Sequence, residues 1–152
     1  MNKLTFLFLL ISSICISQTY TGKVIGIKDG DTVVVLDSLN YQTTLRIAEV
    51  DCPEKSQAFG TKAKQFTSDE IYLKQIKYIV TDIDSYGRSI AKIYYENNKY
   101  LSAEIIRNGF SWQYKKYSTS KLLAKLEEEA RQNKRGLWID PNPIYPSDFR
   151  RK

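Results

Sequence analysis

Residues 19–50 read TYTGKVIGIKDGDTVVVLDSLNYQTTLRIAEV, and the architecture of the whole chain follows from this run. Three parts of the run are rich in β-branched residues, which favour strands, and turn-forming residues separate them. The strand segments are 19–28, 32–37 and 41–50, and the separators are Asp29-Gly30 and Ser38-Leu39-Asn40. Because Asp-Gly is a strong hairpin signal, the run predicts a three-stranded meander.

The remainder of the chain alternates between helical and strand patterns. Phe59, Ala63 and Phe66 recur at helical spacing in a segment that ends near Leu73. The segments after it are strands at 75–81 and 88–95 around a polar turn, a short helix at 101–108 before Gly109, a longer helix at 120–135 before Gly136, and an irregular strap at 137–152. The expected buried stripe of the longer helix is Leu122, Leu123, Leu126 and Ala130.

These elements predict one domain of the α+β class, mainly β. Five short strands with about three interspersed helices fit a small, partly open barrel of the OB type. The 152 residues contain no internal repeat and no low-complexity linker, and a chain of this length can bury a core large enough to fold alone. We expect the domain to span residues 18–152 and to be a monomer.

The first 17 residues are typical of a secretory signal peptide. Lys3 gives a positive start, residues 4–16 are mostly apolar, and Cys15-Ile16-Ser17 places small residues at positions −3 and −1 of a cut before Gln18. The apolar run is short of the ~20 residues of a membrane span. We expect cleavage after Ser17, export to the periplasm or the exterior, and no stable membrane association afterwards. A retained anchor, or a lipid on Cys15, is the alternative left open.

The amino-acid composition limits the kinds of reaction and of binding site that this chain can have. The chain has 23 Lys and Arg against 17 Asp and Glu, which suits a polyanionic partner such as nucleic acid, although it is also a common route to solubility. It has no histidine, which excludes Ser-His-Asp hydrolases, histidine-based nucleases and conventional zinc sites. Cleavage after Ser17 leaves Cys52 as the single cysteine, so no internal disulfide is expected.

Three polar segments lie at the ends of the predicted strands. They are DGDT at 29–32, LRIAEVDCPE at 45–54 and DSYGR at 84–88. Each alone has an ordinary explanation as a hairpin turn, a strand end or a loop. Together, Asp31, Asp51 and Glu54 offer oxygen ligands that suit a hard cation such as Ca²⁺. Arg46 and Arg88 can grip phosphate with paired hydrogen bonds. This set is sufficient for in-line attack on a phosphodiester.

In order and spacing, the three segments resemble those of the staphylococcal nuclease (thermonuclease) family. The matching patterns are Asp-Gly-Asp-Thr, Leu-Arg-Ile-x-x-Val-Asp-x-Pro-Glu and Asp-x-Tyr-Gly-Arg, and the C-terminal segment with Gly136-Leu137-Trp138 and Phe149-Arg150 is also similar. The resemblance covers about residues 20–150. It implies a calcium-dependent endonuclease on an OB-fold barrel that cleaves DNA and RNA with low sequence specificity and leaves 3′-phosphate ends.

The resemblance also implies a role for individual residues. Asp31 and Asp51 correspond to the metal carboxylates of the family, and Cys52 to a residue whose main-chain carbonyl binds calcium. Glu54 corresponds to the general base, or at least to the group that holds the attacking water. Cys52 stands where threonine is more usual, which leaves this role intact if only the carbonyl binds metal.

Arg46 and Arg88 correspond to the two arginines that bind phosphate and stabilise the transition state. Tyr86, inside the third segment, is expected to contact a nucleotide. Two departures bear on substrate preference: residues 55–60 form a shorter loop than the lysine-rich loop of the best-known members, and Ser85 stands where a lysine often grips a terminal phosphate.

The aromatic residues near position 114 allow two interpretations. Trp112, Tyr114 and Tyr117 alternate with Lys115-Lys116, which could form a base-stacking rim that tracks phosphates. Core packing of Trp112 is the other interpretation, and Trp138 is assigned to the core.

Two rival functions belong to other classes. One is a non-catalytic nucleic-acid-binding OB module, which the presence of Arg46, Glu54 and Arg88 argues against. The other is a secreted basic surface protein without chemistry, which leaves the three segments unexplained.

Overall fold

The computed structural model describes residues 18–151. The predicted signal peptide, its cleavage after Ser17 and the lipid alternative at Cys15 therefore lie outside the described residues. Among the helices of the described part, none combines the length and the apolar character that crossing a membrane requires.

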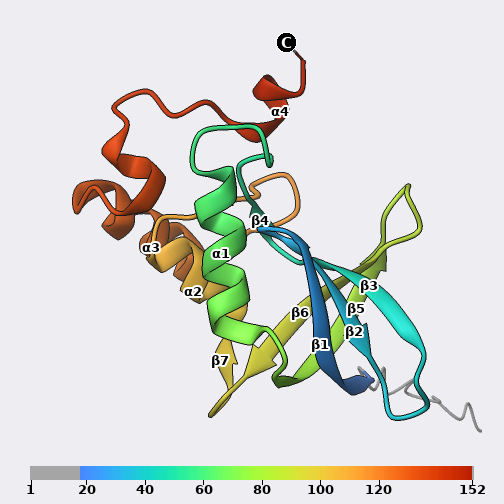
Figure 1. Ribbon diagram of the computed structural model, residues 1–152. Coiled ribbons are helices and arrows are strands. Elements are labelled where there is room, and N and C mark those ends of the chain that lie inside the picture. Colours follow the sequence, from blue (N-terminus) through green and yellow to red (C-terminus); the bar gives the residue numbers. More distant parts are fainter. Residues whose placement is uncertain (1–17, 152) are drawn as a thin grey trace, which may run out of the picture.

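Five strands close into a barrel, as the sequence predicts (Figure 1). They are β1 (Thr19–Asp29), β2 (Thr32–Leu36), β3 (Gln42–Ile47), β5 (Gln75–Ile83) and β6 (Ser89–Tyr95). β1 lies between β2 and β5, and β3 and β6 extend the sheet at either side, all in antiparallel pairs. A parallel pairing of β3 with β6 closes the cycle. The barrel brings the β1–β2 turn, the end of β3 and the β5–β6 hairpin to the same end of the molecule.

The prediction of one strand over 41–50 is wrong, because the strand breaks at Glu49. This residue has a left-handed backbone with φ 67°. Its carboxylate accepts hydrogen bonds from the hydroxyls of Tyr100 and Ser118, which hold the bend in place. The chain then leaves the barrel as β4 (Val50–Asp51), which pairs with β8 (Trp112–Gln113). The bend aims the segment after it at the end of the barrel.

Three helices lie together on one side of the barrel (Figure 1). They are α1 (Gly60–Ile71), α2 (Leu101–Arg107) and α3 (Lys121–Gln132), with the short strand β7 (Lys99–Tyr100) before α2. Ser120 caps α3 by accepting a hydrogen bond from the Leu123 amide. The three predicted helices are thus present, within a few residues of their expected bounds.

Two predictions for this region are wrong. Leu122, assigned to the buried stripe of α3, is 57% exposed. α3 ends at Gln132 rather than at Gly136, because Lys134 already has a positive φ of 50°. Gly136 instead opens the 3₁₀ helix η1 (Gly136–Ile139), where an added Cβ would collide with the Gly109 carbonyl. The strap is also less irregular than expected, since it contains η1 and α4 (Pro146–Phe149).

Two clusters form the core. The first fills the barrel and its helical flank with residues such as Val33, Leu45, Ile93 and Ile105. The second lies under the strap and consists of Trp112, Ala130, Leu137 and Trp138, with Phe59 and Tyr145 packed against it. Trp112 is therefore a core residue rather than part of a rim, and the assignment of Trp138 to the core is confirmed.

Candidate active site

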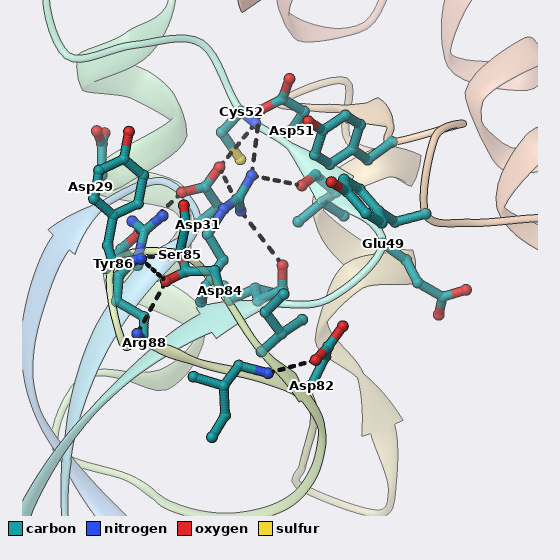
Figure 2. A pocket seen from close by; sticks show the side chains of 18 of the residues that line it. Asp29, Asp31, Glu49, Asp51, Cys52, Asp82, Asp84, Ser85, Tyr86 and Arg88 are labelled. Atoms are coloured by element: carbon teal, nitrogen blue, oxygen red, sulfur yellow. Dashed lines mark hydrogen bonds and ion pairs between the residues drawn. The ribbon is translucent and has the colours of Figure 1, made fainter.

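A cavity of about 540 Å³ opens where the three polar segments meet at the end of the barrel (Figure 2). Its lining includes all seven residues that the sequence singles out: Asp31, Arg46, Asp51, Cys52, Glu54, Tyr86 and Arg88. They come from the β1–β2 turn, from β3 to the loop after β4, and from the β5–β6 hairpin. Side chains that are more than 50 positions apart in the sequence thus face one space.

Arg46 bridges the two aspartates that were predicted as metal ligands. Its Nη1 lies 2.9 Å from Asp31 Oδ2, and its Nη2 lies 3.3 Å from Asp51 Oδ1. Nη2 also donates to the Val50 carbonyl at 3.3 Å. Burial lowers the pKa of the Arg46 guanidinium, but Asp31 and Asp51 more than offset this and raise the pKa above its ordinary value. A buried cation thus holds two carboxylates that would otherwise repel each other.

Asp51 is the least satisfied group of the site. It is 1% exposed, and its Oδ2 has no hydrogen-bond partner. Burial raises the pKa of this carboxyl to about 6, despite the opposing effect of Arg46. A buried carboxylate oxygen without a hydrogen bond costs free energy unless a cation lies close to it, and Arg150 Nη2 is 4.0 Å away. Asp51 therefore fits a ligand of a hard divalent ion.

Asp31 and Cys52 are joined through the backbone. The Cys52 amide donates to Asp31 Oδ2 at 3.1 Å, and the Thr32 hydroxyl donates to Asp31 Oδ1 at 3.1 Å. The Cys52 thiol is buried, next to Gly30, and takes no part in these contacts. Within residues 18–151, no three side chains of His, Cys, Asp or Glu converge as a metal-holding group. A cation here would need main-chain and water oxygens besides the two aspartates.

The raised pKa of Asp51 predicts how the free energy of unfolding depends on pH. A carboxyl whose pKa is higher in the folded than in the unfolded chain stabilises the fold when protonated, and this contribution is lost as the pH rises through about 6. In the presence of chelator at pH 7.5, Asp51→Asn is therefore expected to raise the free energy of unfolding by about 1–3 kcal/mol. Urea unfolding from pH 4 to pH 8 measures this, and the gain should vanish near pH 4. A gain that is independent of pH contradicts the buried-carboxylate explanation.

Arg88 is held from two sides. Its Nε donates to Asp84 Oδ2 at 2.7 Å, and its Nη1 lies 3.5 Å from the Thr32 hydroxyl. Asp84 Oδ1 accepts from the amides of Tyr86 and Arg88, at 2.9 and 3.0 Å, which fixes the hairpin loop. The guanidinium lies 5.4 Å from the centre of the Tyr86 ring, and Figure 2 shows these side chains on one edge of the cavity. Asp84 is therefore a positioning residue, a role that its place at the start of the third segment did not indicate.

Glu54 is placed by a tight turn after Pro53. Its amide donates to the Gln57 side chain at 3.1 Å, and its carbonyl accepts from the Gln57 amide at 2.8 Å. Gly60 packs so closely against the Glu54 carbonyl that an added Cβ would collide with it. The Glu54 carboxylate pairs with Arg150 Nη1, and Arg150 Nη2 lies 4.0 Å from Asp51 Oδ2. Arg150 belongs to the C-terminal pattern, but nothing in the sequence alone assigned it to the site.

Two tyrosines complete the wall of the cavity. Tyr114 and Tyr117 line it, with ring centres 4.9 Å apart in an edge-to-face arrangement. Tyr117 is 60% exposed, and Lys116 lies over its ring. Of the predicted aromatic rim, these two tyrosines therefore lie at the site.

Comparisons with known proteins agree with this geometry. A family model described as staphylococcal nuclease homologue matches residues 44–140. A protein of Haemophilus influenzae named as an uncharacterized endonuclease is 38% identical over 152 residues, which are 100% of this chain and 84% of that protein. The micrococcal nuclease of Shigella flexneri is 34% identical over 153 residues, covering 93% of this chain and 87% of the other. An uncharacterized endonuclease of Escherichia coli O157:H7 is 33% identical over 131 residues, 86% of this chain and 85% of that protein.

Proposed function

The chain belongs to the staphylococcal nuclease family of hydrolytic endonucleases, and from this premise we propose that it is a calcium-dependent enzyme that cleaves DNA and RNA with low sequence specificity and leaves 3′-phosphate ends. The observation that carries the proposal is the shared cavity, in which Glu54 faces the same space as Arg46 and Arg88. No group in the proposed mechanism reads a base edge, which supports low sequence specificity.

In the proposed mechanism, Glu54 takes the proton of the attacking water, or orients that water toward phosphorus. Arg46 and Arg88 bind the phosphate and neutralise the charge that develops as the 5′ oxygen leaves. Asp84 holds Arg88 through Nε and Thr32 makes a long contact with Nη1, which leaves Nη2 to meet a phosphate. The tight turn at Gln57 keeps the Glu54 backbone in place.

The size of the rate enhancement that enzymes achieve explains why several catalytic groups are needed. Enzymes commonly accelerate their reactions by ~10⁶–10¹⁷-fold. A general base supplies only ~10²–10⁴ of this factor. One well-placed donor to the transition state adds ~10²–10³. Glu54 alone would thus be a poor catalyst, whereas Glu54 with two arginines and a bound cation is an adequate one.

The cation would be held by Asp31, Asp51 and the main-chain carbonyl of Cys52. The fit rests on the buried Asp51 oxygen that accepts no hydrogen bond and on an all-oxygen donor set, which suits Ca²⁺. When bound, a divalent ion supplies Lewis-acid stabilisation of charge on the phosphate oxygens.

The setting of the enzyme is also part of the proposal. The sequence of residues 1–17 supports export and cleavage after Ser17, and we expect the domain 18–152 to act as a monomer without stable membrane association. Two observations favour the enzyme over a non-catalytic binding module. The chain matches a protein named as an endonuclease over its whole length, and it keeps Arg46, Glu54 and Arg88.

Product analysis tests the proposed reaction. The mature protein with Ca²⁺ is expected to cleave plasmid DNA, single-stranded DNA and RNA. Because the 5′ oxygen is the leaving group, the fragments should have 5′-hydroxyl ends that polynucleotide kinase labels without prior phosphatase treatment. Mass spectrometry of a cut oligonucleotide should place the phosphate on the 3′ end. Binding without cleavage, or fragments with 5′-phosphates, would contradict the proposal.

A further inference from the structure

Arg150 reaches the cavity from the opposite end of the chain. It follows α4, which Figure 1 shows beyond the N-terminal end of α1. Its Nη1 donates to Glu54 Oε1, 96 positions earlier in the sequence, and its Nη2 lies 4.0 Å from Asp51 Oδ2. The side chain lines the same cavity as Arg46 and Arg88. A third guanidinium is therefore present at the site.

The strap that carries Arg150 is anchored by two contacts just before α4. The Gln57 side chain, which also accepts from the Glu54 amide, donates to the Ile144 carbonyl. The ring of Tyr145 lies 5.3 Å from that of Trp112 in an edge-to-face contact. These contacts fix the backbone just before α4, so the position of Arg150 is part of the fold. The turn that places Glu54 is the same turn that holds the strap.

The neighbouring arginine provides a contrast. The side chain of Arg151 is 79% exposed, and its nearest acidic partner is Asp148 at 3.9 Å. Arg151 does not line the cavity. Of these two consecutive arginines with the same charge, Arg150 reaches the site and Arg151 does not.

The partner of Arg150 sets it apart from the other two arginines. Arg46 pairs with two aspartates and Arg88 with Asp84, none of which is proposed to accept a proton during the reaction. Arg150 pairs with Glu54, so its guanidinium occupies an oxygen of the carboxylate that is proposed to take the proton of the attacking water. Glu54 must therefore lose this contact to act. The Arg150 side chain is 46% exposed, so its guanidinium can leave at little cost in free energy.

Seven acidic residues and three arginines line the cavity, so carboxylates outnumber guanidinium groups there. A phosphodiester that enters this acidic cavity needs a cationic partner, and a guanidinium that leaves Glu54 can provide it. We propose that Arg150 is a third phosphate-binding arginine, which rests on Glu54 and transfers to a phosphate of the nucleic acid when the substrate binds. This inference rests on the proposed function, and it adds that substrate binding itself frees the base.

Binding under conditions that prevent cleavage tests the inference. A fluorescent 12-nucleotide single strand is titrated by anisotropy in chelator, at salt concentrations from 20 to 200 mM. Arg150→Ala is expected to weaken binding about fivefold at low salt. It should also reduce the slope of log K against log salt by about 0.7, the value for one lost phosphate contact on a single strand. Arg150→Lys, which keeps the charge, should keep most of the slope.

Arg151→Ala is the matched control, because it removes the same charge one residue away. It is expected to leave the salt slope within about 0.2 of the wild-type value. If Arg150→Ala and Arg151→Ala give the same affinity and slope, the inference is wrong. A wild-type protein that neither binds nor cleaves the strand would instead overturn the proposed function.

A double-mutant cycle tests the competition between Glu54 and phosphate for Arg150. Glu54→Gln is expected to tighten binding of the strand in chelator, because it releases Arg150 and removes a negative charge. The gain should be at least about twofold smaller in the Arg150→Ala background, where no guanidinium is released. Equal gains in the two backgrounds would show that Arg150 does not move from Glu54 to the substrate.

Discussion

Glu54→Gln is expected to lower kcat by ~10²–10⁴-fold at saturating single-stranded DNA and Ca²⁺. The amide has nearly the shape of the carboxylate but cannot accept the proton of the attacking water. The carboxylate pairs with the half-exposed Arg150, so its loss should change the free energy of unfolding by less than about 1 kcal/mol. Single-turnover cleavage of a labelled oligonucleotide measures the rate, and urea unfolding measures the stability.

A matched control separates chemistry from the loss of one negative charge. Glu128 is exposed on α3, where it accepts a hydrogen bond from Gln132, and it does not line the cavity. Glu128→Gln is therefore expected to leave kcat within about twofold of the wild-type value, as for surface substitutions generally. A kcat for Glu54→Gln within tenfold of the wild-type value would mean that another group handles the proton.

The sequence predicts most of this fold because its signals are local. Asp29-Gly30 marks the β1–β2 turn, and the β-branched runs on either side become the paired strands. The barrel and its placement of Asp31, Arg46 and Arg88 follow from such signals together with the family pattern. Glu49 is different, since its left-handed backbone depends on Tyr100 and Ser118, which are distant in the sequence. No periodicity within 41–50 indicates the break there.

The parts of the site that the sequence did not predict depend on contacts between distant segments. Phe149-Arg150 is visible as a C-terminal pattern, but only the packed strap shows that Arg150 meets Glu54 and that Arg151 does not. In the same way, the burial of Asp51 follows from the bend after β3 rather than from its neighbours in sequence. Leu122 fits the helical stripe of α3 but lies outside the face that packs against α2, β8 and η1.

Removing divalent ions is expected to abolish cleavage and to lower thermal stability. Loss of several kcal/mol of Lewis-acid stabilisation corresponds to a rate decrease of at least ~10²-fold. A ligand at 100 times its Kd stabilises a fold by about 2.7 kcal/mol, which for a domain of this size corresponds to a rise in Tm of about 5–15 °C. Calorimetry during a Ca²⁺ titration measures the rise, and activity with Mg²⁺ or Mn²⁺ tests whether Ca²⁺ is required for turnover.

The substitution Asp51→Asn tests whether the proposed ligands hold the calcium. It should raise stability in chelator and lower it in Ca²⁺. In chelator at pH 7.5 the buried carboxylate, with its pKa raised to about 6 by burial, opposes folding, so the variant is more stable. In Ca²⁺ at 1,000 times its Kd the ion stabilises the wild-type protein by about 4.1 kcal/mol through the same carboxylate, so the variant loses most of the rise in Tm and becomes the less stable protein. This reversal in the order of stability requires that the same carboxylate destabilises the fold without the ion and binds the ion when it is present. A rise in Tm that survives the substitution would place the calcium elsewhere on the protein.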